Sequence, residues 1–143
     1  MINIHSILFS EEFFNRLKDI KDMYNEQNED KDKIHVSNLV RIALTETYVN
    51  KSISTISNIL FNYSCSFSEK YNGTDVMYSI RTYTPEINKR FEDIQSTCVV
   101  WSNNKQRTTP NKSVLTRIAV MEQFYNKSDR ECIELIDKYK GEL

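Results

Sequence analysis

Glycine and proline are almost missing from this chain, with two of each among 143 residues. A glycine-rich phosphate loop needs several glycines close together, and a many-stranded sandwich needs a tight turn after nearly every strand. Both kinds of protein are therefore disfavoured. The scarcity of helix breakers instead favours long helices. With 39% hydrophobic and 27% charged residues, the composition is typical of one soluble globular domain.

Cysteine and histidine are also scarce. Cys65, Cys98 and Cys132 are widely spaced and none belongs to a CxxC pair, while His5 and His35 lie far apart in the sequence. This pattern disfavours a zinc site and predicts reduced thiols in the cytoplasm. Because no nucleophile motif or pair of metal-binding histidines is present, we expect no enzyme activity, no metal and no cofactor.

Long hydrophobic runs and an excess of one charge are absent too. The longest apolar run, residues 98–101, is far too short to cross a membrane. The first twelve residues lack the basic start of a signal peptide, so we expect none. Nineteen basic and twenty acidic residues give a net charge of −1. This excludes a strongly basic coat for nucleic acid, but it leaves room for a local basic patch.

What the chain does contain is an internal repeat. Residues 37–52, SNLVRIALTETYVNKS, align with residues 113–128, SVLTRIAVMEQFYNKS, with nine identities in sixteen positions. Roughly one identity is expected by chance from average residue usage. Upstream, Arg16 aligns with Arg90 on matching helical stripes, and downstream Tyr63 aligns with Tyr139. The sequence therefore predicts two repeats, residues 1–72 and 73–143, which share one core.

Each repeat has the pattern of a short strand followed by three helices. Ser10 and Thr84 are good N-caps for the first helix of each repeat, and Pro85 suits the first helical position. Ser128 and Glu131 have the spacing of a capping box for the last helix. We expect strands at 2–9 and 77–83, and helices at about 11–25, 37–49, 53–63, 85–100, 111–126 and from 128 onward.

Four segments carry a further pattern: residues 10–17 with SNLVRIAL at 37–44, and TPEINKRF at 84–91 with SVLTRIAV at 113–120. This order of cap, helix and second helix resembles the ribbon-helix-helix family of DNA-binding proteins, in which two strands pair as a ribbon that enters the major groove. The fold implied by the resemblance is mostly α with a short two-stranded antiparallel ribbon, and the two repeats form an intramolecular pseudo-dimer. A plain helical repeat bundle is the alternative.

The tandem layout is similar to that of TraY-type accessory proteins of plasmid conjugation. The resemblance implies a sequence-specific double-stranded DNA-binding protein that acts as a transcription regulator or a relaxosome accessory factor. It also implies a monomer that is itself a pseudo-dimer, with higher oligomers possible. The alternative is a protein-interaction module without DNA binding, whose partner contacts the third helices, residues 53–63 and 132–139.

Charge points to candidate phosphate contacts in the second repeat. Residues 94–121 contain no acid but four basic residues. The resemblance puts phosphate at the start of each second helix, where Ser37 and Ser113 are predicted to cap the helix and contact DNA. Capping alone is an equally good role for these hydroxyls. Arg117 and its repeat mate Arg41 could each contact DNA. The alternative is that they form ion pairs with Asp93 and Asp19, respectively, in the first helix of each repeat. The remaining basic candidates for phosphate contacts are Lys105, Arg107 and Lys112.

The strands supply candidate base contacts. Neither strand alternates cleanly between polar and apolar residues, and the basic residue that the family places two positions before the cap is replaced by Leu8 and Thr82. Side-chain chemistry favours Ser79 and Arg81 pointing outward, whereas the family's usual phase favours the other face of that strand. The candidates are Asn3, His5, Ser79 and Arg81. His5 could instead pack at the edge of the ribbon without contacting a base. Arg81 could instead form an ion pair at that edge.

Overall fold

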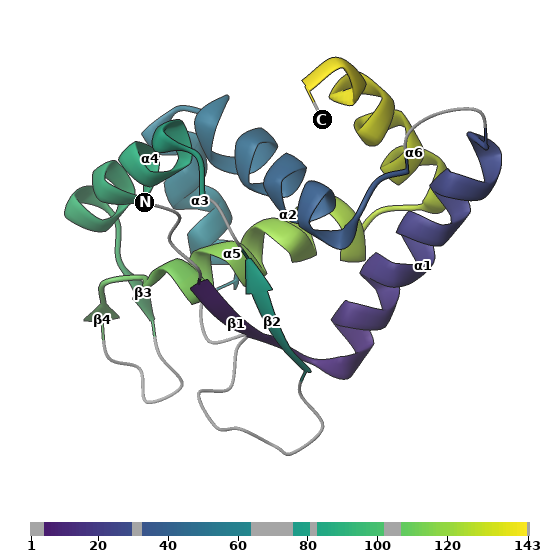
Figure 1. Ribbon diagram of the computed structural model, residues 1–143. Coiled ribbons are helices and arrows are strands. Elements are labelled where there is room, and N and C mark those ends of the chain that lie inside the picture. The colour runs from purple at the N-terminus through teal and green to yellow at the C-terminus, as the bar shows by residue number, and fades with distance from the viewer. Residues whose placement is uncertain (1–4, 30–32, 64–75, 81–82, 102–106, 143) are drawn as a thin grey trace.

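The computed structural model describes residues 5–29, 33–63, 76–80, 83–101 and 107–142. Helices dominate the chain, and Figure 1 shows them packed around α2 and α5, with the strands β1 and β2 on one side. The elements in chain order are β1 (His5–Phe9), α1 (Glu11–Gln27), α2 (Val36–Leu44), the π turn η1 (Thr45–Val49), α3 (Ile53–Tyr63), β2 (Val76–Ile80), α4 (Pro85–Thr97), β3 (Val100–Trp101), β4 (Arg107–Thr108), α5 (Lys112–Val120), the π turn η2 (Met121–Tyr125), α6 (Asp129–Lys138) and the 3-10 turn η3 (Lys140–Glu142).

The first helices begin where the sequence predicts. The Ser10 hydroxyl accepts a hydrogen bond of 3.2 Å from the Phe13 backbone N–H, and the Thr84 hydroxyl accepts one of the same length from the Ile87 N–H. Each bond satisfies one of the free N–H groups that open a helix. Pro85 occupies the first position of α4. These cap predictions are confirmed.

The second helices end differently from the prediction. Each is predicted as one continuous helix, but α2 and α5 stop after nine residues and widen into a π turn. The Asn50 N–H bonds the Thr45 carbonyl at 3.2 Å, and the Asn126 N–H bonds the Met121 carbonyl at 3.0 Å. Since both bonds span five residues at matching positions, the wide turn is a property of the repeat.

The fold class predicted from the sequence needs correction. The described residues are mostly helical, with six α-helices, three shorter helical turns and strands of no more than five residues. Within the described residues, β1 and β2 pair antiparallel over His5–Phe9 and Val76–Ile80, and Tyr83, the predicted end of the second strand, is not part of a strand. The predicted ribbon residues 2–4, 81 and 82 lie outside the described residues. The predicted class, mostly α with a single ribbon, is therefore wrong as stated. The described residues form a helical fold with two short two-stranded pairs, β1–β2 and β3–β4.

The second strand pair, β3 with β4, is absent from the prediction, which extends the preceding helix to residue 100. The helix α4 instead ends at Thr97, and Cys98 already has an extended backbone with φ −106° and ψ 153°. Val99 and Val100 follow, and β-branched side chains fit a strand better than a helix end. Val100 pairs with Thr108, and Trp101 pairs with Arg107.

Buried side chains from both repeats form one hydrophobic cluster. The helices α2 and α5, which occupy matching positions of the repeats, pack side by side at its centre (Figure 1). Neither repeat could enclose these side chains alone, since each contributes only part of the wall. The largest fully buried side chains are Phe9, Leu17, Ile20, Leu39, Leu44, Tyr48, Ile56, Leu60, Ile87, Phe91 and Phe124.

The first helix of one repeat is fastened to the second helix of the other. Arg16, on α1, donates to the carbonyl oxygens of Phe124 at 3.4 Å and Lys127 at 2.9 Å, and to the Asp129 carboxylate at 2.6 Å. These carbonyls follow the C-terminal end of α5, where helix geometry leaves acceptors without partners. The guanidinium is therefore a C-terminal cap supplied from a distant part of the chain.

The third helices also cross to the opposite repeat. Ile56 and Leu60 of α3 are fully buried. Tyr63, at the end of α3, donates to the Glu122 carboxylate at 2.5 Å and accepts from the Asn126 amide at 2.8 Å. The apolar stripe of this helix, which the sequence offers to a protein partner, is thus used inside the chain.

The end of α6 repeats this arrangement with the roles of the halves exchanged. Tyr139 donates to Glu46 at 2.5 Å and accepts from Asn50 at 2.8 Å. Burial tends to raise the pKa of Glu46, but the hydrogen bonds from Tyr139 and Lys138 outweigh it, so that the pKa is lowered. Cys132 and Ile136 of α6 are fully buried, like their counterparts on α3.

Candidate nucleic-acid interface

The strand pair separates two of the predicted base contacts. His5 lies opposite Ile80, and Ser6 lies opposite Ser79. Opposite residues of an antiparallel pair share a face, and neighbouring residues alternate between faces. His5 therefore holds a position on the same face as Phe9, which is fully buried, while Ser79 holds a position on the other face.

Several predicted contacts lie outside the described residues, namely Asn3, Arg81 and Lys105. Arg107 is described, and it belongs to the short strand β4. Among the described basic residues of the acid-free window, Arg107 thus lies on the β3–β4 strand pair, while Lys112 and Arg117 lie on α5. The sequence contains the β-branched pattern of this strand pair at residues 99–100 and 108–109, and that pattern is the signal by which it could be found.

Ser37 and Ser113 are not the caps of their helices, which corrects that prediction. Asn111 caps α5, because its Oδ1 accepts from the Val114 N–H at 2.8 Å. His35 occupies the cap position of α2, and its N–H donates to Asn38 at 2.8 Å. Asparagine and serine are about equally good N-caps, so the sequence alone does not distinguish Asn111 from Ser113 as the cap of α5.

Both serines occupy the second position of their helices and are half-buried. The backbone N–H at this position has no acceptor within the helix, since the first four N–H groups point beyond the helix start. Contact between these residues and a phosphate stays a prediction, and the backbone N–H groups of the first turn are the donors that point toward the helix start.

Lys112 is held by the protein itself. Its ammonium lies 3.4 Å from the Asn88 side-chain oxygen and 5.9 Å from the centre of the Tyr83 ring. The ring in turn is fixed by a 2.9 Å bond between the Tyr83 hydroxyl and Thr116. The Lys112 side chain is thus held beside α4 at the start of α5 by these two contacts.

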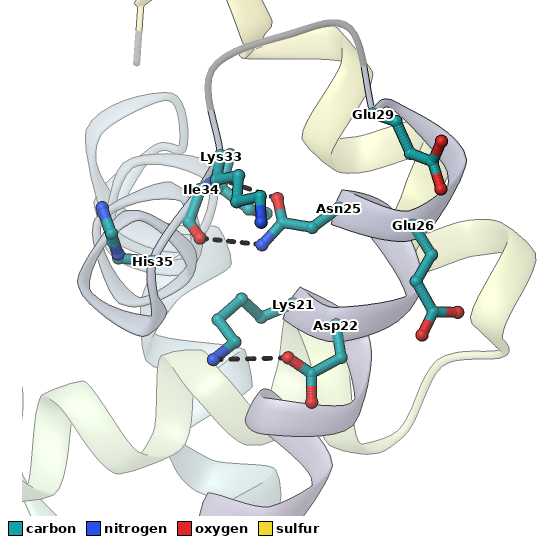
Figure 2. Close-up of a pocket in the computed structure, with 8 residues that line it drawn as sticks. All are labelled: Lys21, Asp22, Asn25, Glu26, Glu29, Lys33, Ile34 and His35. Carbon is teal, nitrogen blue, oxygen red and sulfur yellow. Dashed lines mark hydrogen bonds and ion pairs between the residues drawn. The ribbon is translucent and has the colours of Figure 1, made fainter.

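A groove of about 620 Å³ lies at the start of α2 (Figure 2). Asn25 of α1 spans it, bonding the Ile34 carbonyl at 3.1 Å and the Ile34 N–H at 2.9 Å. In the second repeat, Gln95 of α4 likewise links the first helix to the segment before the second helix, because it donates to the Pro110 carbonyl at 3.1 Å. The lining of the groove mixes charges of both signs: Lys21, Asp22, Asn25, Glu26, Glu29, Lys33, Ile34 and His35.

The starts of α2 and α5 therefore differ in electrostatic surroundings. Three carboxylates line the groove at the start of α2, whereas the sequence around the start of α5 contains no acid between residues 94 and 121. A phosphate is repelled by carboxylates and attracted by the positive end of a helix. The groove at the start of α2 thus holds two lysines beside its three carboxylates, whereas the charged residues near the start of α5 in the sequence are all basic.

Other kinds of site receive little support from the described residues. They contain no group of three or more His, Cys, Asp or Glu side chains that could hold a metal ion. Cys98 and Cys132 are buried and unlinked, and burial raises the pKa of both thiols. None of the helices in these residues is long and apolar enough to span a membrane.

Comparison with known proteins gives no relative for this chain. No protein-family model matches the sequence, and neither a curated protein nor a solved structure does.

Proposed function

We propose that the protein binds double-stranded DNA in a sequence-specific manner, in the cytoplasm, as a transcription regulator or an accessory factor of plasmid conjugation. The observation that carries this proposal is the contact between β1 and α5, the helix whose start lies in the acid-free basic window (Figure 1). An antiparallel strand pair has the width to enter the major groove, where every base pair presents a distinct pattern of donors and acceptors. The β1–β2 pair would supply the contacts to bases.

Phosphate binding would fall mainly on the start of α5. The N–H groups of Lys112 and Ser113 have no acceptor within the helix, and the helix dipole makes this end positive. Arg107 on β4 and the Lys112 ammonium add full charges nearby in sequence. The start of α2 offers the same backbone groups, but the carboxylates of the adjacent groove weaken its attraction for phosphate.

A protein-interaction module that does not bind DNA is the second candidate. Two observations favour it: the net charge of the chain is −1, and the Lys112 ammonium is already occupied by Asn88 and Tyr83. The two candidates differ in salt dependence, because DNA binding releases counterions and protein association through neutral surfaces does not.

The test is selection of bound duplexes from a random pool, followed by affinity measurements at several salt concentrations. We expect one enriched sequence, and a log–log salt slope of about 0.9 per neutralised phosphate. Arg107→Glu should weaken binding to all duplexes and lower the slope. The matched control is Arg130→Glu on α6, which lies on the far side of the molecule from β1–β2 (Figure 1).

Absence of any enriched sequence, together with no binding at low salt, would overturn the DNA-binding proposal and favour the interaction module. Equal effects of the two substitutions would overturn only the role of the basic window.

A further inference from the structure

The two third helices occupy matching positions of the repeats but have very different outer faces. Helix α3, Ile53–Tyr63, contains no Asp, Glu, Lys or Arg. Helix α6 contains six such residues in ten: Asp129, Arg130, Glu131, Glu134, Asp137 and Lys138. Both helices bury their apolar side in the same core. The difference is therefore confined to the side that faces solvent.

The neutral face of α3 also exposes apolar surface. Phe61 is 70% exposed and Val99 is 40% exposed, and they are the exposed large hydrophobic residues within the described part of the chain. Val99 lies between α4 and β3 in the chain, and α3 contacts both of these elements. Phe61 and Val99 therefore lie on adjoining elements, in keeping with the contacts of α3 with α4 and β3 (Figure 1).

The fold does not require an apolar residue at these positions. The repeat mate of Phe61 is Asp137, which is exposed, and the mate of Val99 is Asn25, which is polar. The second repeat thus shows that the same backbone position accepts a charged residue. Since Phe61 is 70% exposed, most of its side chain lies outside the core, and a role at the surface is the physical alternative to packing.

We propose that the outer face of α3, centred on Phe61, is the surface through which two copies of this chain associate. In a two-fold symmetric contact the same surface of the two copies meets, so a face with net charge repels the matching face of the other copy. The face of α6 carries four acids and two bases and meets this obstacle, whereas the face of α3 carries no charge. Exposed serine, threonine and asparagine side chains can hydrogen-bond across the axis around a central pair of phenylalanine rings.

The contact would be small. One face of an 11-residue helix with a single exposed aromatic ring falls at the low end of interface sizes, where complexes are transient. We therefore expect association at high micromolar concentrations and a monomer in dilute solution. This inference does not depend on DNA binding, and its test is made without DNA.

The test is sedimentation velocity and light scattering of the full chain over a wide concentration range. The average mass should rise from 16.9 kDa toward twice that value as concentration increases. Phe61→Asp, which copies the residue of the other repeat, should keep the mass at the monomer value. Asn58→Glu, which copies Glu134 on the same face without touching Phe61, should weaken association as well.

The matched control is Glu134→Asn, which makes the reverse exchange on α6 and should leave association unchanged. Melting curves of all variants should agree closely, because the substituted side chains are exposed. A wild-type chain that stays at 16.9 kDa throughout would overturn the proposal. So would association that persists in both α3 variants, since another face would then be responsible.

Discussion

Arg16 and Arg90 perform the same task on opposite repeats. Arg16 caps the end of the second helix of the second repeat, and Arg90 caps the end of the second helix of the first. The Arg90 guanidinium donates to the Tyr48 carbonyl at 2.9 Å and to the Lys51 carbonyl at 2.6 Å. Tyr48 and Lys51 are the repeat mates of Phe124 and Lys127, whose carbonyl groups accept from Arg16. The two sets of bonds are therefore related by an approximate two-fold axis.

Removing either guanidinium should destabilise the whole fold. Arg90→Ala leaves two carbonyl groups at a helix end without their donor, and we expect a loss of about 1–3 kcal/mol in the free energy of unfolding. Arg90→Lys should recover only part of it, because a lysine cannot donate in two fixed directions. Urea denaturation measures the difference.

Arg130→Ala is the control for this prediction, since the exposed pair of Arg130 with Glu134 should contribute only a few tenths of a kcal/mol. A loss for Arg90→Ala no larger than that of the control would show that the cross-repeat cap does not stabilise the protein.

Stability should fall at alkaline pH through Tyr63. Burial and the hydrogen bond to Glu122 raise the pKa of Tyr63 from its ordinary value of 10 to about 12. The unfolded chain therefore loses this proton first, so the stabilising contribution is complete below pH 10 and disappears as pH rises toward 12. Tyr63→Phe should be less stable at neutral pH and should show a flatter decline. Thermal melts from pH 8 to about 12 measure both, and parallel curves for the two proteins would contradict the assignment.

The two repeats should not fold separately. Fragments 1–72 and 74–143 each lose the helix caps and the core wall that the other supplies, so each alone should show little helical circular dichroism. Mixing the two fragments in equimolar amounts should restore the helical signal. A fragment that melts cooperatively as a monomer would be incompatible with a shared core.

DNA affinity, if present, should depend more on the start of α5 than on the start of α2. Lys112→Glu should lower the salt slope by about one unit, whereas Lys33→Glu, in the acid-rich groove beside α2, should change it less. Lys112→Glu also removes the contact with Asn88, so its melting temperature must be measured alongside. Equal changes in slope would argue against the unequal division between repeats.

Local capping signals are readable from the sequence, and they locate most helix starts. Ser10, Thr84 and Ser128 cap α1, α4 and α6 as predicted, because a short polar side chain followed by an apolar stripe leaves little choice. The start of α5 is less determined, since Asn111 and Ser113 are both suitable and packing decides between them. The function and the DNA contacts stay predictions.

Contacts between the repeats could not be predicted from the sequence. The alignment pairs Arg16 with Arg90, but nothing local indicates that their acceptors are carbonyl groups of the opposite repeat. The π turns are equally hidden, because residues 45–49 and 121–125 are compatible with an ordinary helix. Which residues of the two strands lie opposite each other depends on pairing across the chain, and the sequence of either strand alone does not determine it.

The reach of Arg16 has a consequence for the order of events during synthesis. Its acceptors at residues 124, 127 and 129 are synthesised only after most of this sequence has been translated. Until then α1 lacks the surface on which it packs, so the first repeat waits as an incomplete intermediate with exposed apolar side chains. Because such distant contacts must close together, folding should be slower than in helical bundles of similar size that are built from neighbouring helices.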